Sequence, residues 1–577
     1  MKSDFFSPFR TPLLVTILLL QAALLLRLGW LTSPNRTELG HFVAARNLWK
    51  NQKFDLFHVN PPLVRVLAAW ATCHLTTLQD DWNDYSSNPR DRSEWAVSIA
   101  FARANDWQDV RYAFFLARAA CIPIILFGGF VGYLWGRELF GEAAGFAFLT
   151  LWTVSPQILG WGATICPDVC AASLGIAALY SYRKWLLCGG WVWCLAAGFA
   201  LGLLLLTKMT WIVAIALWPL LGMIVLRNQA VRMPGILAVP AVALLVLNAG
   251  YLFDGSFQPL KEYQFISRSL GDAETGNRFT DSPFGWLPVP FPKEFVLGFD
   301  TQKLDFERGF TSYLCGTFSE RGWWYYYFVA FFVKAPLGTI FLTLLAIVVF
   351  PFQSFRSHWQ EEMILLAPLF ILLFVVSVQT GFSLHARYII PACPFLFLGI
   401  IRVFRSSVRP IQTLAWLLLL GTVASSLSVY PYSMSYFNEG IGGPQNGPKY
   451  LLGSNVDWGQ DLYELKQWYD SHPEARPLRT AYSGTYPLES LGIAKGQEPP
   501  IWTPRQAQTE NLAYLHSFGP QPGWFLFAIN DLYDPTEKYN WIKSATPTAR
   551  IGYSFRIYHL TKEEANQLRI SLNLPEL

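Results

Sequence analysis

Long apolar runs separated by short charged loops constrain this chain more than any other feature of its sequence. Of its 577 residues, 52% are hydrophobic and only 15% are charged, which is unlike an ordinary soluble domain. A helix needs about 20 mainly apolar residues to cross a membrane, and about eleven runs approach that length. They are residues 11–31, 113–136, 142–159, 166–186, 190–206, 209–226, 233–253, 327–351, 363–380, 388–403 and 411–431. The sequence therefore predicts an α-helical polytopic membrane protein.

The distribution of Lys and Arg predicts the orientation of these spans. The first run lies where a signal peptide would, but it is long and no small-residue cleavage site follows before Pro34, so we expect it to be retained. Lys and Arg concentrate in cytoplasmic loops. With the N-terminus inside, the short cytoplasmic loops carry Arg137, Arg183, Lys184, Arg227, Arg232, Arg356, Arg402, Arg405 and Arg409. An odd number of spans then gives a plasma or inner membrane protein with an extracytoplasmic C-terminus.

The same topology places three large segments outside the cytoplasm. They are residues 32–112, 254–326 and 432–577. Residues 1–431 form the predicted transmembrane domain, in which the second external segment is expected to be loops with short surface helices. Composition changes sharply after Tyr430, which predicts a small C-terminal extracytoplasmic α/β domain over 432–577. Its predicted elements are a helix over 461–469 and strands over 523–529 and 551–558.

Several ionisable residues lie at the external ends of the predicted spans. Glu38 follows the first span, Asp168 opens the fourth, Lys208 follows the fifth and Arg387 precedes the tenth. Charges at a membrane boundary cost free energy unless they have partners or a function. We therefore expect these four side chains, with Lys334 as a further candidate, to face one outer cleft.

These residue types suit the transfer of a sugar from a phosphate carrier. That reaction needs a base for the acceptor hydroxyl and cations for the departing phosphate. Phosphate is a stable anion, so its oxygen needs no proton donor. Glu38 and Asp168 are the candidate catalytic carboxylates. The candidate phosphate ligands are Lys208, Lys334 and Arg387.

Each candidate also has a purely structural interpretation. Lys and Arg side chains at the membrane boundary often lay their aliphatic part along apolar surface so that the charged group reaches water. Glu38 could be a first-turn helix residue capped by Thr37, and Asp168 could simply favour a helix N-terminus after Pro167. In the tail, residues 457–460 have the spacing of a capping box for the helix that follows.

Beyond these single residues, a series of short motifs resembles bacterial members of the family 39 glycosyltransferases, relatives of protein O-mannosyltransferases and aminoarabinose transferases. The motifs are TELGH at 37–41, NPPLVR at 60–65, PD at 167–168, RGWWYY at 321–326, KAP at 334–336, RY at 387–388, YFNE at 436–439 and SNVDWGQDL at 454–462. The resemblance runs in order from about residue 34 to the C-terminus. It implies the C-type glycosyltransferase fold, an outer cavity that meets a lipid-linked donor such as polyprenyl-phosphate mannose, and inversion at the anomeric carbon.

The resemblance also implies an acidic pair in the first external loop, whose first member is usually aspartate and is a favoured base. Here that position is Thr37, which cannot act as a base near neutral pH. The role must pass to Glu38 or Asp168, or be lost, and we favour Glu38.

Other positions of the same motifs supply candidate ligands. Some relatives hold a divalent cation, and the outward carboxylates with His41 or His58 could bind one. Asn60, Asp457 and Gln460 are candidate substrate contacts.

The leading prediction is a membrane enzyme that transfers a mannose-like hexose or a pentose from a polyprenyl phosphate to an acceptor hydroxyl at the outer face. The acceptor could be a protein, a lipid or a glycan of the cell envelope, because fold does not decide this. One alternative is a lipid or solute transporter, although transporters usually place polar groups near the bilayer midplane. Another is an inactive relative that binds glycolipid, which Thr37 motivates. The net charge of +4 is small and gives no indication of nucleic-acid binding.

Overall fold

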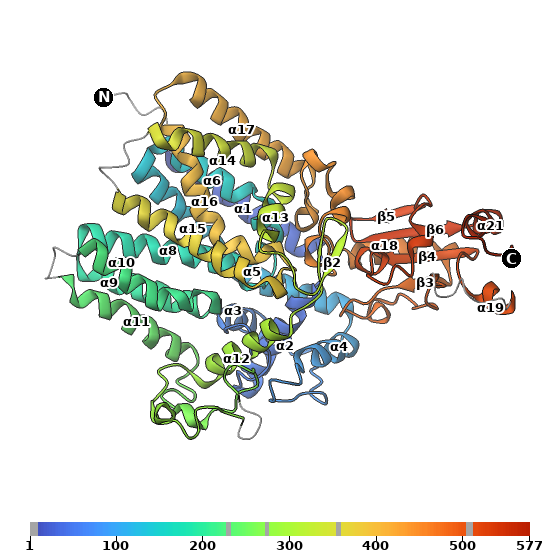
Figure 1. The fold of residues 1–577 in the computed structure, drawn as a ribbon, viewed down its shortest axis with the longest axis horizontal. Helices are drawn as coiled ribbons and strands as arrows, with labels where there is room; N and C mark the ends of the chain where they lie inside the picture. Colours follow the sequence, from blue (N-terminus) through green and yellow to red (C-terminus); the bar gives the residue numbers. More distant parts are fainter. Residues whose placement is uncertain (1–9, 227–231, 272–275, 353–358, 504–511) are drawn as a thin grey trace.

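The structure is a computed structural model that describes residues 10–226, 232–271, 276–352, 359–503 and 512–577. A helical bundle makes up most of the molecule, and a small domain with a sheet lies at one end of it (Figure 1). The bundle helices are α1 (Arg10–Leu31), α5 (Trp107–Phe140), α6 (Glu142–Val154), α7 (Pro156–Gly162), α8 (Pro167–Cys188), α9 (Trp191–Leu205), α10 (Val213–Leu226), α11 (Pro234–Gly250), α13 (Tyr326–Lys334), α14 (Leu337–Val349), α15 (Trp359–Val378), α16 (Cys393–Ile400) and α17 (Arg409–Ser428).

Within the described residues, six helical segments are long and apolar enough to cross a membrane. They are α1, α5, Met209–Leu226 with α10, α15, Ala386–Arg405 with α16, and α17. Two bent pairs raise the number to eight if each pair is one span: α6 with α7, bent by 53°, and α13 with α14, bent by 119°. Both breaks precede a proline, which cannot donate a backbone hydrogen bond. The α-helical polytopic class is confirmed, but the predicted count of eleven spans is not.

The helices at the three remaining predicted spans, α8, α9 and α11, are not among the segments that are long and apolar enough to cross a membrane. The helices α9 and α11 have 15 and 17 residues. The helix α8 has 22 residues, and almost all of them are buried by neighbouring helices. Large apolar side chains on the bundle surface are exposed, for example Val192 at 78% and Leu237 at 73%. Such a surface is suited to lipid rather than water.

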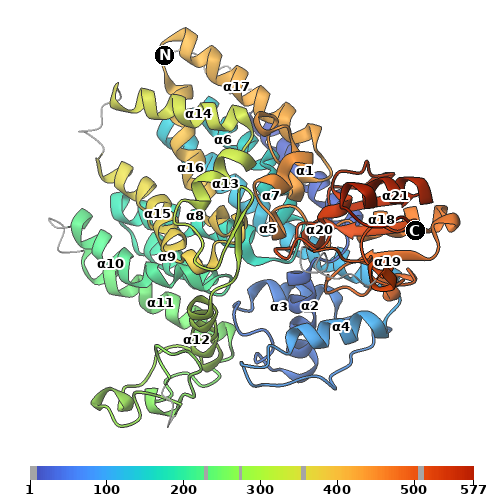
Figure 2. The same cartoon turned by 45° about the vertical axis from the view of Figure 1, so that its right-hand side comes forward.

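The two segments predicted to be external lie together along one edge of the molecule, the first of them next to the C-terminal domain (Figure 2), and we call them the external layer. Their elements are α2 (Arg36–Asn51), α3 (Leu63–Thr72), α4 (Glu94–Ala104), α12 (Lys293–Arg308), β1 (Ser312–Leu314) and β2 (Thr317–Ser319). The second segment was expected to hold only loops and short surface helices, and the 16-residue α12 and the β1–β2 hairpin correct that prediction. The helix α12 begins after Pro292, whose fixed φ suits a helix start.

The C-terminal domain is α/β, as predicted. Its elements are α18 (Leu462–Ser471), α19 (Leu512–Ser517), α20 (Ile529–Leu532), α21 (Lys562–Ser571), β3 (Leu478–Ala481), β4 (Gly523–Ala528), β5 (Ala549–Ile551) and β6 (Phe555–Leu560). The strands form one sheet in the order β3-β4-β6-β5, in which only β3 and β4 are parallel. The single strand predicted over 551–558 is in fact two strands, because a turn at Gly552, with φ +49°, separates β5 from β6.

The chain just after α1 pairs with the chain just before α18. The Ser33 amide donates to the Gln460 carbonyl at 2.9 Å, and the Arg36 amide donates to the Trp458 carbonyl at 3.1 Å. The Ser33 hydroxyl adds a hydrogen bond of 2.6 Å to the Gly459 carbonyl. These contacts join residues more than 400 positions apart and fix the C-terminal domain over the start of α2.

The basic residues used to predict orientation lie at the far ends of helices whose other ends meet the C-terminal domain or the external layer. Arg183 near the end of α8 pairs with Glu138 at 3.0 Å and with Glu361 at 2.6 Å. Arg402 pairs with Glu362 at 2.8 Å. These ion pairs tie α5, α8, α15 and the segment after α16 together. Arg227 and Arg356 lie outside the described residues.

Candidate functional site

A cavity of about 1100 Å³ lies where the bundle, the external layer and the C-terminal domain meet. Its polar lining residues come from the starts of α2 and α8, from Asn60 and Arg92, from the segment before Met209, from α12 and from residues within 379–388, 457–459, 482–486 and 530–531. Apolar side chains line it as well. Ile212, Val213, Val375, Val376 and Phe382 come from the bundle, and Phe299, Phe306 and Phe310 come from α12 and the segment after it. The cavity is therefore amphipathic, because its lining combines apolar and charged side chains.

Cations outnumber carboxylates among the described lining residues. The cations are Arg36, Arg92, Lys208, Lys303, Arg308 and Arg387, and the carboxylates are Asp168, Asp305, Asp457 and Asp531. Asp168 pairs with Lys208, and Asp305 accepts two hydrogen bonds from Arg92 at 2.8 and 3.0 Å. Because an anion is attracted by the excess of positive charge, this cavity suits a ligand that carries phosphate.

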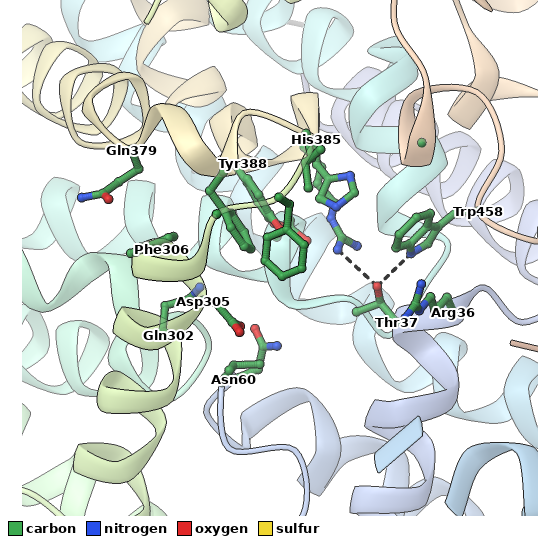
Figure 3. Close-up of a pocket in the computed structure, with 18 of the residues that line it drawn as sticks. Arg36, Thr37, Asn60, Gln302, Asp305, Phe306, Gln379, His385, Tyr388 and Trp458 are labelled. Carbon is green, nitrogen blue, oxygen red and sulfur yellow. Dashed lines mark hydrogen bonds between the residues drawn. The ribbon is translucent and has the colours of Figure 1, made fainter. Parts of the chain in front are cut away.

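Thr37 lines the cavity beside Arg36 and Trp458 (Figure 3). Its hydroxyl oxygen accepts a hydrogen bond of 3.2 Å from Arg387 and one of 2.9 Å from the Trp458 indole. Arg387 is 7% exposed, lies 4.6 Å from the Trp161 ring centroid and has no carboxylate within ion-pair distance among the described residues. Its Nε has no hydrogen-bond partner in that part of the chain. A buried guanidinium with unused donor capacity is suited to bind phosphate oxygens.

Asp168 and Lys208 form an ion pair beside these groups. Asp168 is in the first turn of α8 after Pro167, where the helix dipole favours a negative charge. The Lys208 ammonium also lies 5.1 Å from the centroid of the Tyr388 ring. The sequence predicted that Asp168, Lys208 and Arg387 face one cleft, and the structure places all three in the lining of the cavity.

Glu38 is placed differently from the expectation that it faces the cleft. It is fully buried, does not line the cavity and pairs with Arg118 through hydrogen bonds of 2.8 and 2.7 Å. The amides of Asn35 and Ile165 also donate to its oxygens at 3.1 Å. Glu38 is the N3 member of a capping box whose N-cap is Asn35, not Thr37. The geometry therefore gives Glu38 a structural role and does not favour it as the base.

The side chains of Lys334 and Gln460 also lie outside the cavity lining and donate hydrogen bonds to backbone carbonyls. The Lys334 ammonium donates to the carbonyls of Met434 and Asn455 at 3.1 and 2.5 Å. The Gln460 amide donates to the Val456 carbonyl at 2.9 Å, among other contacts. Neither side chain lines the cavity. Both fix the turns that carry Trp458 into place.

Asp457 and Asn60 do line the cavity. Asp457 accepts a hydrogen bond of 2.9 Å from the Gly459 amide, and burial raises its pKa to about 7. The capping box suggested for residues 457–460 is wrong, because the N-cap of α18 is Asp461 and no side chain caps that helix. The aspartate instead stabilises a tight turn.

The two candidate histidine ligands do not fit a metal site. His41 is fully buried against the Phe57 ring, 4.7 Å away, and its pKa is lowered well below its usual value by burial and then by the positive charges of Arg65 and Arg387. Nδ1 of His58 lies 2.8 Å from an oxygen of Glu294. Across the described residues, no three His, Cys, Asp or Glu side chains lie close enough to hold a metal ion. No step proposed below therefore uses a metal.

The helix α12 contributes cavity residues that sequence reasoning missed. Asp305, Gln302 and Phe306 from this helix face Tyr388 and Asn60 across the cavity (Figure 3). Arg36 was also missed, and its guanidinium lies 5.0 Å from the Trp95 ring centroid. Arg36 directly precedes the first acidic motif, which was the only available signal for it.

Comparisons with known proteins find solved structures that are similar over most of the chain. No family model matches the sequence, and no curated protein matches it. ArnT from Cupriavidus metallidurans bound to undecaprenyl phosphate is similar in structure, with 13% identity, a TM-score of 0.47 and coverage of 95% of this chain and 97% of that one. For the apo state of ArnT the values are 12%, 0.46, 96% and 98%.

The oligosaccharyltransferase from Archaeoglobus fulgidus in its apo form is a further structural neighbour. It has 13% identity, a TM-score of 0.44 and coverage of 90% of this chain and 70% of that one. Because identity and TM-score are both low, we base the proposed function on the cavity side chains of this chain.

Proposed function

We propose that this chain is a membrane glycosyltransferase that moves a sugar from a polyprenyl phosphate to an acceptor hydroxyl at the outer face of the membrane. The observation that carries the proposal is the amphipathic cavity, whose lining combines an excess of cations with apolar side chains from the bundle and from α12. A polyprenyl-phosphate sugar has the same division between an anionic head and a long apolar chain. Its reacting carbon would then lie beside the buried cations.

The proposed reaction is a single displacement. The acceptor oxygen forms a bond to the anomeric carbon of the sugar, and the bond from that carbon to the phosphate oxygen breaks. The electron pair of the broken bond leaves with the phosphate, and the proton of the acceptor hydroxyl goes to a carboxylate. One displacement inverts the configuration at the anomeric carbon. The sugar is a hexose or a pentose in this proposal.

Asp168 is the proposed base. It is a carboxylate in the lining of the cavity, and its ion pair with Lys208 fixes its position there. Glu38 is excluded from this role in the proposal because Arg118 and two backbone amides occupy its oxygens. Thr37 orients Arg387 through its hydroxyl and needs no acidic function.

Arg387, Lys208 and Arg36 are the proposed phosphate ligands. Preorganised cations stabilise the charge that develops on the departing phosphate without having to reorganise. Lys334 positions the loop that carries Asn455 and is not a ligand in this proposal. The basic ends of the bundle helices lie opposite the cavity, so the positive-inside rule supports an outward-facing cavity.

The proposal is tested by release of free polyprenyl phosphate from a panel of polyprenyl-phosphate sugars, with a membrane extract as the source of acceptor. Asp168→Asn and Arg387→Met should each lower the release rate by at least tenfold, about the loss expected for a general base or a charged phosphate contact. The exposed residues Asp109 and Arg90 supply matched control variants, Asp109→Asn and Arg90→Met. Release that is unchanged in both cavity variants would overturn the site. No release from any donor by folded protein would favour a transporter or an inactive glycolipid-binding relative.

A further inference from the structure

The two sides of the polar part of the cavity differ in charge. All six lining cations come from residues 36–387, and the two carboxylates on that side, Asp168 and Asp305, are paired with Lys208 and Arg92. The other side is formed by residues within 452–459, 482–486 and 528–535 of the C-terminal domain. Among its described lining residues there is no Lys or Arg, whereas Asp457 and Asp531 are both present. We call this side the acidic wall.

The acidic wall is built around one loop, residues 482–486, held against α20. Asp531 in α20 accepts hydrogen bonds from the Ser483 amide at 3.1 Å and the Ser483 hydroxyl at 2.7 Å. The Tyr482 hydroxyl donates to the Tyr486 carbonyl at 3.1 Å. The backbone of Gly484 lies so close to the Tyr482 side chain that a Cβ at Gly484 would be 2.0 Å from the Tyr482 hydroxyl oxygen. The loop is therefore packed to present Tyr482, Ser483 and Asp531 to the cavity.

This combination of groups has a definite chemical preference. A fixed carboxylate accepts hydrogen bonds from neighbouring hydroxyls, and it uses only some of its acceptor sites on Ser483. The half-buried rings of Tyr482 and Tyr533 offer apolar faces with polar tips. An anionic group would be repelled by ionised Asp531, and no Lys or Arg among the described lining residues of the wall offsets that repulsion. Asp457 adds to it only in part near neutral pH, because burial raises its pKa to about 7.

We infer that the acidic wall is the acceptor site and that it takes an uncharged saccharide, rejecting acceptors that carry phosphate or carboxylate near the reacting hydroxyl. This inference rests on the proposed transfer reaction and names its acceptor class. A saccharide supplies both adjacent hydroxyls for the carboxylate and a C–H face for the rings. Asp531 is then the residue that determines acceptor specificity, and the donor phosphate occupies the opposite, cationic side.

The test is a binding titration of the purified full chain, followed by saturation-transfer NMR. The probes are mannotriose, cellotriose and chitotriose, their 6-phosphorylated counterparts, and a peptide rich in Ser and Thr. Saturating polyprenyl phosphate is present throughout, so that the phosphorylated probes cannot use the cationic side. Its own binding is measured first, so that failure of the donor site and failure of the acidic wall are told apart.

The wild type should bind at least one neutral trisaccharide at least tenfold more tightly than its phosphorylated counterpart. Asp531→Lys should lower the affinity for that trisaccharide by about tenfold or more and raise the affinity for the phosphorylated form, because the charge is reversed. Ser483→Ala, which only loosens the carboxylate, should weaken neutral binding to a smaller extent. The exposed Asp470 gives the matched control, Asp470→Lys, which should not change either affinity.

Three results would overturn the inference. The first is equal or tighter binding of the phosphorylated probes by the wild type. The second is neutral binding that is unchanged in both Asp531→Lys and Ser483→Ala. The third is binding of the peptide but of no saccharide, while polyprenyl phosphate still binds.

Discussion

Replacing Glu38 by glutamine removes one charge from an ion pair that is fully enclosed by protein. The Glu38 and Arg118 side chains are 0% and 2% exposed. Glutamine would keep one acceptor oxygen, but its amide group would face two donors, the Asn35 amide and the Arg118 Nη2. Removing one partner of a buried ion pair lowers the free energy of unfolding by about 3–5 kcal/mol. Three carbonyl acceptors of Arg118, those of Gly29, Thr32 and Ser33, remain and place the expected cost at the lower end of that range.

The assay compares thermal unfolding with sugar transfer in the same preparations. Glu38→Gln should lower the apparent Tm of the purified protein clearly, whereas transfer per folded molecule should stay within a few fold of the wild type. The exposed Glu439 provides the matched control, Glu439→Gln, which should change neither quantity. The double variant Glu38→Met with Arg118→Leu should be more stable than Glu38→Gln, because no buried charge is then left without a partner. Abolished transfer at an unchanged Tm would refute the structural role of Glu38.

Three further predictions concern stability. Burial raises the pKa values of Asp457 and Asp461 to about 7, whereas an unfolded aspartate has a pKa near 3.9. Between these two values the native protein binds more protons than the unfolded chain. The free energy of unfolding should therefore fall as pH rises from about 4 to 7. Asp457→Asn should flatten that fall in a series of Tm measurements against pH, and an unchanged slope would contradict it. Lys334→Met leaves two buried carbonyls without their donor and should cost about 1–3 kcal/mol in chemical denaturation, where no loss would argue against the contact. Gly132→Ala should destabilise the bundle by about 1–3 kcal/mol, because its Cβ would meet an aromatic ring at 1.9 Å, whereas Gly399→Ala has open space and is the control.

The membrane body could be predicted from sequence because hydropathy is a local property. Each of the eleven predicted spans contains helix, and the α/β class of the tail follows from turn and strand patterns. The number of spans could not be predicted in the same way. Breaks such as the one between Lys334 and Leu337 depend on how the helix after the break packs, and the 119° bend there is a property of the tertiary structure.

The site was predictable where a charge lies at the end of an apolar run and where a motif carries a polar residue, as with Asn60 and Asp457. Asp168, Lys208 and Arg387 could be grouped because topology puts those ends on one side. The partner of Glu38 could not be inferred, since Arg118 lies 80 residues away and inside an apolar run. The acidic wall could not be predicted from the sequence for a similar reason, because Ser483 and Asp531 come into contact only once β3 and β4 have paired.

The most direct test of the central claim is transfer of a radiolabelled sugar from polyprenyl-phosphate donors to acceptors in a membrane extract by the purified full chain. The cavity geometry predicts labelled product together with an equal amount of free polyprenyl phosphate, and loss of both in Asp168→Asn but not in Asp109→Asn. Label that stays entirely in the donor while the protein remains folded, or product formation that is undiminished in Asp168→Asn, would contradict the claim.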